Sequence, residues 1–549
     1  MPTFLGEYGM AIKDLFAEGV KGGWKVHNGS RREDGAQFEA DIAIIGTGAG
    51  GGVTAEILSQ AGLKVLLIEA GPLKSSNDFN MDESRAYADL YQEGSGRMSK
   101  DGAITIMQGR CVGGTTVINW TSSFRTPPQT LQYWTDNFDT EGTSETDMAP
   151  WFAQMEKRLN VQTWQIPANG NNDVLKRGCD KLGYEWKIIP RNVASCWNLG
   201  YCGTGCPTNA KQSMLVTTIP GALQNNAELL YLTRAEHFRF NGDAVSELVC
   251  AGMDQHSVHP TGHRFTVKAK HYVLSAGAIG SPGLLLRSNA PDPYQLTGKR
   301  TFLHPVPMVM AVMPEKIEGY YGAPQSIHSD HFQWKDGVSG PAGFKLEATP
   351  LQPGLAAALM KAHGQKMADS MADLPYTACT LALLRDGFHP DSPGGQVMLR
   401  NDGTPVLDYQ MTDYLWDGVC RALQTMAEIQ FAAGARKVRP MHQDAPYVDS
   451  VEKVTALIND LPMEKYRTLI GSAHVMGGCP MGEDRYRTVV NSRGEHHYLE
   501  NLSVIDGSVF PTSIGANPQL SIYGQAARMA SLLAGRLTGA SSGIPIQPV

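Results

Sequence analysis

Long apolar runs are absent from this chain of 549 residues. No stretch approaches the roughly 18 consecutive apolar residues of a membrane-spanning helix, so no such helix is expected. Runs of basic residues are absent too, and the net charge is −7, which argues against nucleic acid as a partner. Cysteine is scarce: nine residues, an odd number scattered along the chain, favour a reducing compartment over a disulfide framework.

No targeting signal is recognised at the start of the sequence. The stretch MPTFLGEYGMAIKDLFAEGV lacks the charged segment and following apolar segment of a secretory signal. The paired arginines of SRRED precede acidic and polar residues, so they do not form a twin-arginine signal. We therefore expect a cytoplasmic protein. Peripheral membrane contact, or export together with a partner that carries a signal, stays open.

The composition is that of a folded, water-soluble protein, with 42% hydrophobic and 18% charged residues. The chain is too long for a single core, so two or more lobes are expected. Near the start, Ile12, Leu15, Phe16 and Val20 fall at helical spacing and predict a short amphipathic helix. We expect this arm to pack on the body, with contact to a membrane surface as the alternative.

A glycine motif, GTGAGG, follows the continuous apolar run at 42–45, which is typical of a parallel strand covered on both faces. A helix pattern comes next, and the following strand, KVLLIE, ends in Glu69. Gly46, Gly48 and Gly51 let the backbone approach a pyrophosphate, the helix N-terminus supplies free N–H groups, and Glu69 accepts from a ribose hydroxyl. The pattern predicts a dinucleotide site without separating FAD from NAD.

Two more stretches combine glycine with small residues. GRCVGGTTVINW lies at 109–120 within residues 72–160, whose pattern is otherwise irregular and polar. YVLSAGAIGSPGLLLRSNA, at 272–290, predicts a strand, a small-residue turn and a helix opened by Ser281 and Pro282. Such turns allow a flat cofactor to come close, although a plain loop or strand–helix connection has a similar pattern.

Two C-terminal stretches carry polar side chains beside turns. In 501–530, a strand ends at Asp506, and Asn517 precedes a proline and an apolar helix, a position from which its side chain can point outward. GSAHVMGGCPMG, at 471–482, sets His474 before two adjacent glycines. Each glycine would cost about 1 kcal/mol inside a helix, so close approach of a ligand explains this stretch better.

From residue 40 to about 535, these motifs and their order resemble the glucose–methanol–choline (GMC) family of FAD oxidoreductases. The resemblance implies an α/β fold: a Rossmann-like FAD-binding domain interwoven with an antiparallel-sheet substrate-binding domain of α+β type. The expected divisions are an N-terminal arm at 1–39, the FAD-binding domain at 40–300 with loop and cysteine-containing insertions at 72–225, the substrate-binding domain at 301–465, and a return to the first domain at 466–549.

The resemblance also assigns site residues. His474 matches the catalytic histidine of the family and is expected to act as general base, with Asn517 as the partner that positions the substrate oxygen. Ile118 stands where some members link the flavin to a histidine, so noncovalent FAD is expected. Besides the glycine motif and Glu69, the expected cofactor contacts are Arg110, Gly114, Thr115, Asn119, Ala235, Asp506 and Pro518.

The stretch SCWNLGYCGTGCPTNAKQS departs from the sugar and choline oxidases of the family. It resembles the flavin subunits of bacterial sugar dehydrogenases and the long-chain alcohol oxidases. Cys196, Cys202 and Cys206 are spaced to hold an iron–sulfur cluster, with a Cys202–Cys206 disulfide, a zinc site or free thiols as alternatives. Three more candidate ligands, His256, His259 and His263, are expected at a solvated hairpin tip rather than at a metal.

The expected activity is the oxidation of an alcohol by an FAD-dependent dehydrogenase or oxidase that acts on CH–OH donors. A hydrophobic primary or secondary alcohol is favoured, because the Met-rich segment 351–372 has the composition of an adaptable apolar entrance, although it is equally compatible with core. A quinone, a cytochrome or oxygen would accept the electrons. The alternatives are a sugar dehydrogenase subunit that passes electrons through a cluster to a cytochrome, and a flavin-binding or electron-transfer subunit without turnover.

Overall fold

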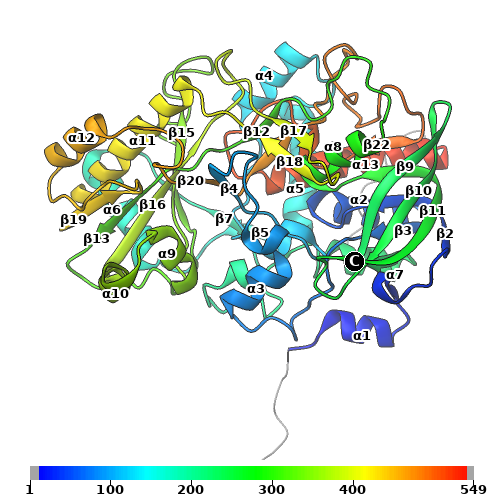
Figure 1. Cartoon of the computed structure of the whole chain (residues 1–549), viewed down its shortest axis with the longest axis horizontal. Helices are drawn as coiled ribbons and strands as arrows, with labels where there is room; N and C mark the ends of the chain where they lie inside the picture. The colour runs from blue at the N-terminus through cyan, green and yellow to red at the C-terminus, as the bar shows by residue number, and fades with distance from the viewer. Residues whose placement is uncertain (1–11, 541–549) are drawn as a thin grey trace, which may run out of the picture.

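Two β-sheets, each with helices packed against it, make up the computed structural model, which describes residues 12–540 (Figure 1). The larger sheet includes β2, β3 and β9–β11 at the right of Figure 1, and the second includes β13, β15 and β16 at the left. The expected fold class, an α/β protein with a Rossmann-like half and an antiparallel-sheet half, is confirmed.

The larger sheet is parallel in its centre. Its spatial order is β1 (Lys25–Asn28), β8 (Glu228–Tyr231), β3 (Val65–Ile68), β2 (Gln37–Ile45), β11 (Pro260–Leu274), β10 (Ala244–Met253) and β9 (Thr233–Asn241), and β22 (Leu502–Val504) also pairs with β11. The pairs from β1 to β11 and the β11–β22 pair are parallel, whereas β9, β10 and β11 form an antiparallel meander. Residues 42–45 and 65–68 are buried, as a parallel strand covered on both faces requires.

Helices pack against this sheet and against one another. They are α2 (Ala49–Gln60), α5 (Glu145–Arg158), α7 (Thr218–Gln224), α8 (Gly277–Arg287) and α13 (Gln519–Thr538). The predicted strand–turn–helix–strand unit is confirmed, with Gly62 at φ +84° just after α2 as expected for a C-terminal cap. Glu56 of α2 is fully buried and is neutralised by Arg158 of α5 at 2.6 Å, which joins the two helices.

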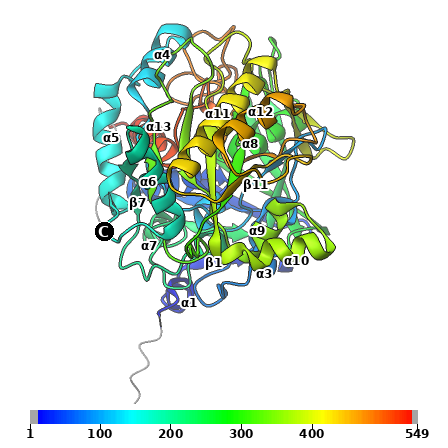
Figure 2. The same cartoon turned by 90° about the vertical axis from the view of Figure 1, so that its left-hand side faces the viewer.

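The second sheet is antiparallel throughout. Its order is β19 (Lys437–Pro440), β13 (Met308–Val312), β16 (Thr377–Leu384), β15 (Phe344–Ala348), β14 (Ile327–Ser329) and β6 (Lys187–Ile188). α6 (Gly170–Leu182), α11 (Asp413–Ala432) and α12 (Val451–Asp460) pack on this lobe, which Figure 2 turns toward the viewer. α6 and β6 come from the stretch that the sequence places among insertions of the first domain, so this lobe draws on an earlier part of the chain.

The Met-rich segment forms two short helices, α9 (Pro353–Met360) and α10 (Gly364–Ala372). Met360 is buried, and Met367 and Met371 pack against a separate apolar cluster that includes Met308 and Met310 of β13. The segment therefore covers apolar side chains of the second sheet. Among the helices of residues 12–540, none has both the length and the apolar content needed to cross a membrane.

Four two-stranded ribbons lie between or beside the sheets. They pair β12 (Thr301–Leu303) with β21 (Val475–Gly477), β17 (Gln396–Leu399) with β18 (Pro405–Asp408), β4 (Ile104–Ile106) with β20 (Ile470–Ser472), and β5 (Val161–Thr163) with β7 (Pro190–Asn192). The β17–β18 hairpin turns at Asn-Asp-Gly, a sequence that favours tight turns between strands. The amino-terminal arm forms α1 (Leu15–Lys21), which buries Phe16 against Trp24, and β1, which adds a strand to the larger sheet.

Two local predictions need correction. The irregular pattern of 72–160 conceals α3 (Glu83–Leu90), α4 (Pro128–Phe138) and α5, and Ser144 begins α5 with a reciprocal capping box to Asp147. α8 begins at Gly277 rather than at Ser281 and Pro282, which lie in its second turn. The hydroxyl of Ser281 is turned to the main chain and to Asp506, so it holds the turn instead of opening the helix.

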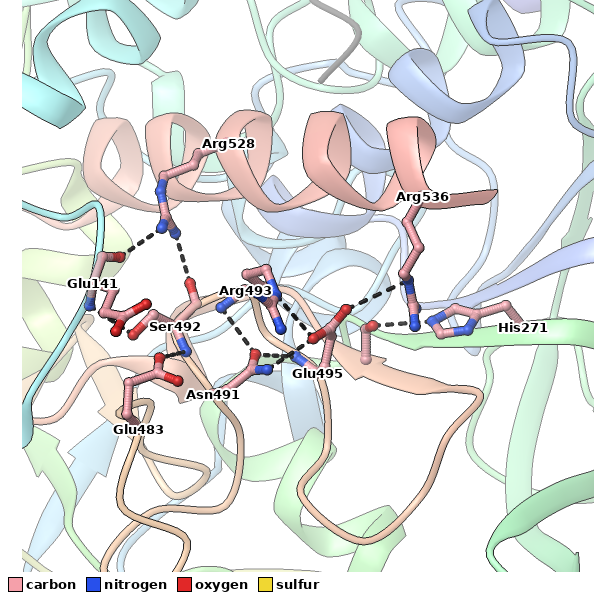
Figure 3. A network of polar contacts seen from close by, with 10 residues as sticks. Glu141, His271, Glu483, Asn491, Ser492, Arg493, Glu495, Arg528 and Arg536 are labelled. Atoms are coloured by element: carbon pink, nitrogen blue, oxygen red, sulfur yellow. Dashed lines mark hydrogen bonds and ion pairs between the residues drawn. The ribbon is translucent and has the colours of Figure 1, made fainter. Parts of the chain in front are cut away.

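A polar network anchors α13, the helix that follows Asn517 (Figure 3). Arg528 donates to the carbonyls of Ser492 and Glu141, each at 2.6 Å, and Arg536 lies 3.4 Å from Glu495. The guanidinium groups fix the helix to the loop between β21 and β22. The start of α13, which borders the site described next, is thereby held in place.

Candidate functional site

A cavity of about 1040 Å³ is enclosed by segments that are far apart in the chain. Its wall takes residues from the β2–α2 turn, from the loop at 107–122, from the start of α8, from 473–475 and from the start of α13. Every catalytic and cofactor residue assigned from the sequence lines this cavity except Gly51. The structure therefore brings the assigned residues together on one wall, and the catalytic and cofactor-binding roles given to them stay predictions.

The glycine turn brings main chain to the cavity wall. Gly46 has φ +101°, and a Cβ there would lie 2.3 Å from the carbonyl oxygen of Ser275. A Cβ on Gly114 would lie 2.8 Å from Cα of Gly48, so the two loops touch through glycine. No side chain caps the N-terminus of α2 at Gly48, which leaves its first N–H groups for a ligand. Gly51 instead packs against the carbonyl of Gly46 and stays behind the wall.

At the same end of the cavity, Glu69 is buried and fixed by three donors. Its carboxylate accepts from the N–H and hydroxyl of Thr47, at 3.1 and 2.6 Å, and from the N–H of Gly71 at 2.9 Å. Burial raises the pKa of Glu69, while these hydrogen bonds and the charge of Arg110 oppose the shift. Nε of Arg110 is buried and has no partner among residues 12–540. This unpartnered donor beside a carboxylate suits the ribose and pyrophosphate of a dinucleotide.

Asp506 also lines the cavity; it follows β22 in the chain and contacts α8. Its carboxylate accepts from the N–H of Gly277 at 2.8 Å, from the hydroxyl of Ser281 at 2.6 Å and from the N–H of Ser508 at 2.8 Å. Burial raises its pKa despite these hydrogen bonds. The side chain is thus oriented before any ligand arrives.

The residues present fit FAD. The uncapped helix, the glycine contact and the orphaned Arg110 donor lie together on the cavity wall, which also includes residues of the loop at 114–119 and His474. In this loop, Thr115 accepts from the N–H of Gly109 at 3.0 Å, and Asn119 donates to Gln519 at 2.7 Å. Ile118 also lines the cavity and has no atom that could form a covalent link to a flavin.

His474 is paired with a second histidine that the sequence did not single out. In the β12–β21 ribbon, Leu303 lies opposite Val475, so His304 and His474 are the next pair in the same register. Their Nδ1 atoms are 3.0 Å apart, and the ring planes are nearly perpendicular at 88°. His304 is fully buried, whereas His474 lines the cavity. The ribbon therefore presents one imidazole to the cavity and places the other behind it.

Burial, with the nearby charge of Lys345, lowers the pKa of His474 to about 3, so the ring is neutral at pH 7. Proton uptake at Nε2 requires the hydrogen of His474 to sit on Nδ1, from which it is donated to Nδ1 of His304. In this arrangement the hydrogen of His304 sits on Nε2. Nε2 can then no longer accept from the N–H of Gly515, which lies 3.3 Å away. The base-competent tautomer gives up one long hydrogen bond, which is worth about 1 kcal/mol.

Asn517, at the start of α13, also rests on a buried partner. Its Nδ2 donates to Oε2 of Glu347 at 3.2 Å, and its Oδ1 is buried without a partner in the described part of the chain. Glu347 lies on β15 of the second sheet. This contact could not be predicted from the sequence, because Glu347 belongs to no motif and lies 170 positions before Asn517.

Lys211 links the cavity loop to the cysteine segment. It is buried, and its ammonium donates to the carbonyls of Val117, Asn119 and Cys202, the last two at 2.8 and 2.7 Å. Burial lowers its pKa to about 8. All three acceptors are main-chain carbonyls. The ammonium therefore fixes the backbone of the cavity loop through these carbonyls rather than through an ion pair with a carboxylate.

Replacing Lys211 by Met should leave three buried carbonyls without their cationic donor. At about 1.5–3 kcal/mol for a hydrogen bond to a charged group, we expect a lower melting temperature and weaker flavin binding. Thermal unfolding with and without added FAD measures both effects. Lys181→Met, at the exposed end of α6, is the control and should change neither. An unchanged melting temperature for Lys211→Met would contradict the role given to this side chain.

The structure gives no support to a metal site at Cys196, Cys202 and Cys206, which stays a prediction. Within the described residues, no group of three or more His, Cys, Asp or Glu side chains is arranged to hold a metal ion, and all three cysteines are free thiols. Each sulfur has its own neighbour: Cys196 accepts from the N–H of Asn198 at 3.4 Å, Arg191 donates to Cys202 at 3.6 Å, and Cys206 lies 3.4 Å from the hydroxyl of Thr208. Of the alternatives, free thiols in a glycine turn match the structure.

The histidines of HSVHPTGH lie, as expected, at a hairpin between β10 and β11. His256 and His259 precede β11 and His263 lies near its start, and all three side chains are exposed. His256 and the two following residues border the mouth of the cavity near Arg110, which donates to the carbonyl of His256 at 3.1 Å.

Comparison with known proteins adds to this geometry. Family models described as GMC oxidoreductase match residues 87–306 and 390–526. A long-chain-alcohol oxidase of Arabidopsis thaliana, FAO4B, is 30% identical over 518 residues, which cover 90% of this chain and 68% of that protein. An uncharacterized GMC-type oxidoreductase of Sinorhizobium fredii, y4nJ, is 28% identical over 93% of this chain and 96% of its own length. The solved structure of pyridoxine 4-oxidase from Mesorbium loti has the same fold, with a TM-score of 0.66, 16% identity, and coverage of 89% and 98%.

Proposed function

Because the chain belongs to the GMC oxidoreductase family, we propose that it is an FAD-dependent enzyme that oxidises an alcohol to a carbonyl compound. The observation that carries the proposal is the presence of His474 and Asn517 on the wall of the cavity whose other end fits a dinucleotide. FAD, when bound, supplies the acceptor for the hydride that leaves the alcohol carbon.

In this proposal, the side chains of the protein handle the hydroxyl group. His474, neutral at pH 7 and held by His304, accepts the hydroxyl proton at Nε2. Asn517 lines the same cavity, and the Nδ2 hydrogen that it does not donate to Glu347 would donate to the substrate oxygen and hold it in line. Arg110, Glu69 and Asp506 would hold the phosphate and sugar parts of the cofactor.

We also propose that the two lobes bind different molecules. The parts of the chain at 40–300 and 466–549 would bind FAD through the larger sheet, and the part at 301–465 would form the substrate side. Glu347 and Gln325 of the second part reach Asn517 and the cavity wall, which supports this division.

We propose a hydrophobic alcohol as the substrate. The cavity wall includes the apolar side chains of Met107, Ile118, Val475 and Ile522 as well as His474. The Arabidopsis relative is by name a long-chain-alcohol oxidase, which agrees with this lining. The Met-rich segment 351–372 contributes no residue to the cavity wall, so the apolar character comes from residues of the loop, the ribbon and α13 instead.

Anaerobic titration of the FAD-loaded protein tests the proposal. Straight-chain primary alcohols of increasing length should bleach the visible flavin band, with longer chains effective at lower concentrations. Failure of every alcohol would favour a flavin-binding protein without turnover, and bleaching by glucose alone would favour a sugar dehydrogenase. Adding oxygen, a quinone or a cytochrome to the reduced protein then identifies the electron acceptor.

A further inference from the structure

Gln519, the first residue of α13, is a buried amide that the proposed reaction does not use. It lines the cavity, is 9% exposed and lies two positions after Asn517. The residue between them is Pro518, whose ring restricts the backbone, so the chain from Asn517 to Gln519 is short and stiff. A buried amide is costly unless it is hydrogen-bonded, so the partners of Gln519 indicate its role.

The amide of Gln519 is hydrogen-bonded to the cavity loop at both of its ends. Its Nε2 donates to the main-chain carbonyl of Ser122 at 2.7 Å, and its Oε1 accepts from Nδ2 of Asn119 at 2.7 Å. Three further partners surround it: the hydroxyl of Ser123 at 3.1 Å, Oδ1 of Asn192 at 3.2 Å and the hydroxyl of Tyr523 at 3.0 Å. One side chain of α13 therefore contacts the loop at two points.

Main-chain groups fix the orientation of both amides. The carbonyl of Ser122 can only accept, so it selects Nε2 of Gln519 and leaves Oε1 for Asn119. The N–H of Thr121 can only donate, and it donates to Oδ1 of Asn119 at 3.3 Å, which leaves Nδ2 for Gln519. Turning either amide over would break a hydrogen bond to the main chain. The pair therefore has one favoured arrangement.

Other contacts fix the two segments that Gln519 joins. Lys211 donates to two main-chain carbonyls of the loop. Arg528 and Arg536 anchor α13 through the network of Figure 3. The Gln519 amide thus connects an anchored loop to an anchored helix, at the point where the helix follows Asn517.

We propose that Gln519 is a positioning residue: by bonding to Asn119 and Ser122, it sets the distance between Asn517 and the loop that is expected to contact FAD. The inference rests on the proposed function, because it assumes that FAD and the alcohol bind in this cavity. Transfer of a hydride from the alcohol carbon depends on the spacing between substrate and cofactor, and a misplacement of about 1 Å costs about 10²-fold in rate. Gln519 acts only through the two segments that it joins.

Gln519→Met removes both hydrogen-bonding ends and keeps an unbranched side chain of similar length. Because the loop then loses this tie to α13, the rate constant for flavin reduction at saturating alcohol should fall by about 10- to 10²-fold. KM and flavin content should change little, since the glycine turn and the Arg110 region of the cavity are untouched. Stopped-flow absorbance measures the rate. A variant that reduces its flavin as fast as the wild type would overturn the positioning role.

The circular dichroism of the visible flavin band supplies a readout that a loss of stability alone would not move. It reports the protein groups around the bound ring, and it needs no turnover. Gln519→Met should change this signal in the oxidised, FAD-loaded protein, because the loop shifts. An unchanged signal would overturn the positioning role. A wild-type protein that binds FAD but is reduced by no alcohol would instead overturn the proposed function.

Gln519→Glu is the second variant, for the case in which Gln519→Met does not fold. It has the same size and keeps an oxygen for Asn119, but its ionised carboxyl has no donor for the carbonyl of Ser122. The dichroism should change and the rate of flavin reduction should fall, by less than in Gln519→Met. Wild-type values of both quantities would overturn the proposal.

Gln430→Met provides the matched control. Gln430 is a buried glutamine of α11 that does not line the cavity, and its Nε2 donates to the carbonyl of Val309 at 2.8 Å and to the hydroxyl of Thr380 at 3.2 Å. Its loss should lower the melting temperature and leave the flavin dichroism and the rate of flavin reduction unchanged. If Gln430→Met reproduced the changes seen in Gln519→Met, they would belong to the loss of any buried glutamine, and the proposal would fail.

Discussion

Replacing His474 by Ala is expected to lower kcat by about 10²- to 10⁴-fold while the protein keeps its flavin, because the hydroxyl proton loses its acceptor. The change removes the imidazole from the cavity wall and leaves His304 without its hydrogen-bond partner at Nδ1. The glycine contact and the Arg110 end of the cavity are untouched, so FAD should remain bound. Stopped-flow measurement of flavin reduction by the alcohol, together with the flavin content of the purified protein, checks both parts.

His442→Ala is the control for this variant. His442 is also buried, and its ring contacts the carbonyl of Pro462 at 3.0 Å and the N–H of Asp444 at 3.1 Å, away from the cavity wall. Its loss should cost stability and leave the rate of flavin reduction close to that of the wild type. If His474→Ala reduced its flavin as fast as His442→Ala, the base would have to be sought elsewhere.

Gly114→Ala should prevent normal FAD binding. Gly114 has φ +55°, which costs about 1–2 kcal/mol for a residue with a Cβ, and that Cβ would lie 2.8 Å from Cα of Gly48. The two atoms that this Cβ would meet, Cα and N of Gly48, belong to the main chain, so the glycine turn and the cavity loop must separate. At 1.4 kcal/mol for each factor of ten, we expect the dissociation constant for FAD to rise tenfold or more. Fluorescence titration of the apoprotein with FAD measures this change.

Gly102→Ala separates backbone strain from the clash. Gly102 also has a positive φ of +77°, but a Cβ there would meet nothing within 4 Å. This variant should be slightly less stable and bind FAD normally. Equal loss of FAD affinity in the two variants would show that strain alone, rather than the contact between the two glycine loops, accounts for the effect.

The sequence predicted the larger sheet and the cavity best where local pattern and chemistry coincide. The run at 42–45, the glycine turn and Glu69 are consecutive, so one short segment specifies a strand, a helix start and an acceptor. Asp506, Asn517 and His474 were found through their resemblance to family motifs, because each stands beside a turn with a recognisable composition. The structure places them on one cavity wall.

The groups behind that wall could not be predicted from pattern. His304 faces His474 only because the β12–β21 register brings them opposite each other, and register is a long-range property of the fold. Glu347 and Lys211 lie in stretches whose local pattern gives no sign of their partners. The neighbours of the three cysteines could not be predicted for the same reason: their spacing allows a cluster, whereas in the structure each sulfur contacts a different neighbour.

The composite cavity wall also sets the moment at which the protein can acquire its cofactor. Gly114 leaves the ribosome about 400 residues before Asn517 and the start of α13. At about 5–20 residues per second, the nascent chain spends roughly 20–80 s with its glycine turn made but its cavity unclosed. β22, which pairs with β11 of the larger sheet, and α13, which packs on α2 and α5, are then still to come. Capture of FAD is therefore a late, essentially post-translational event, and the apolar strands need protection from aggregation until the last helix docks.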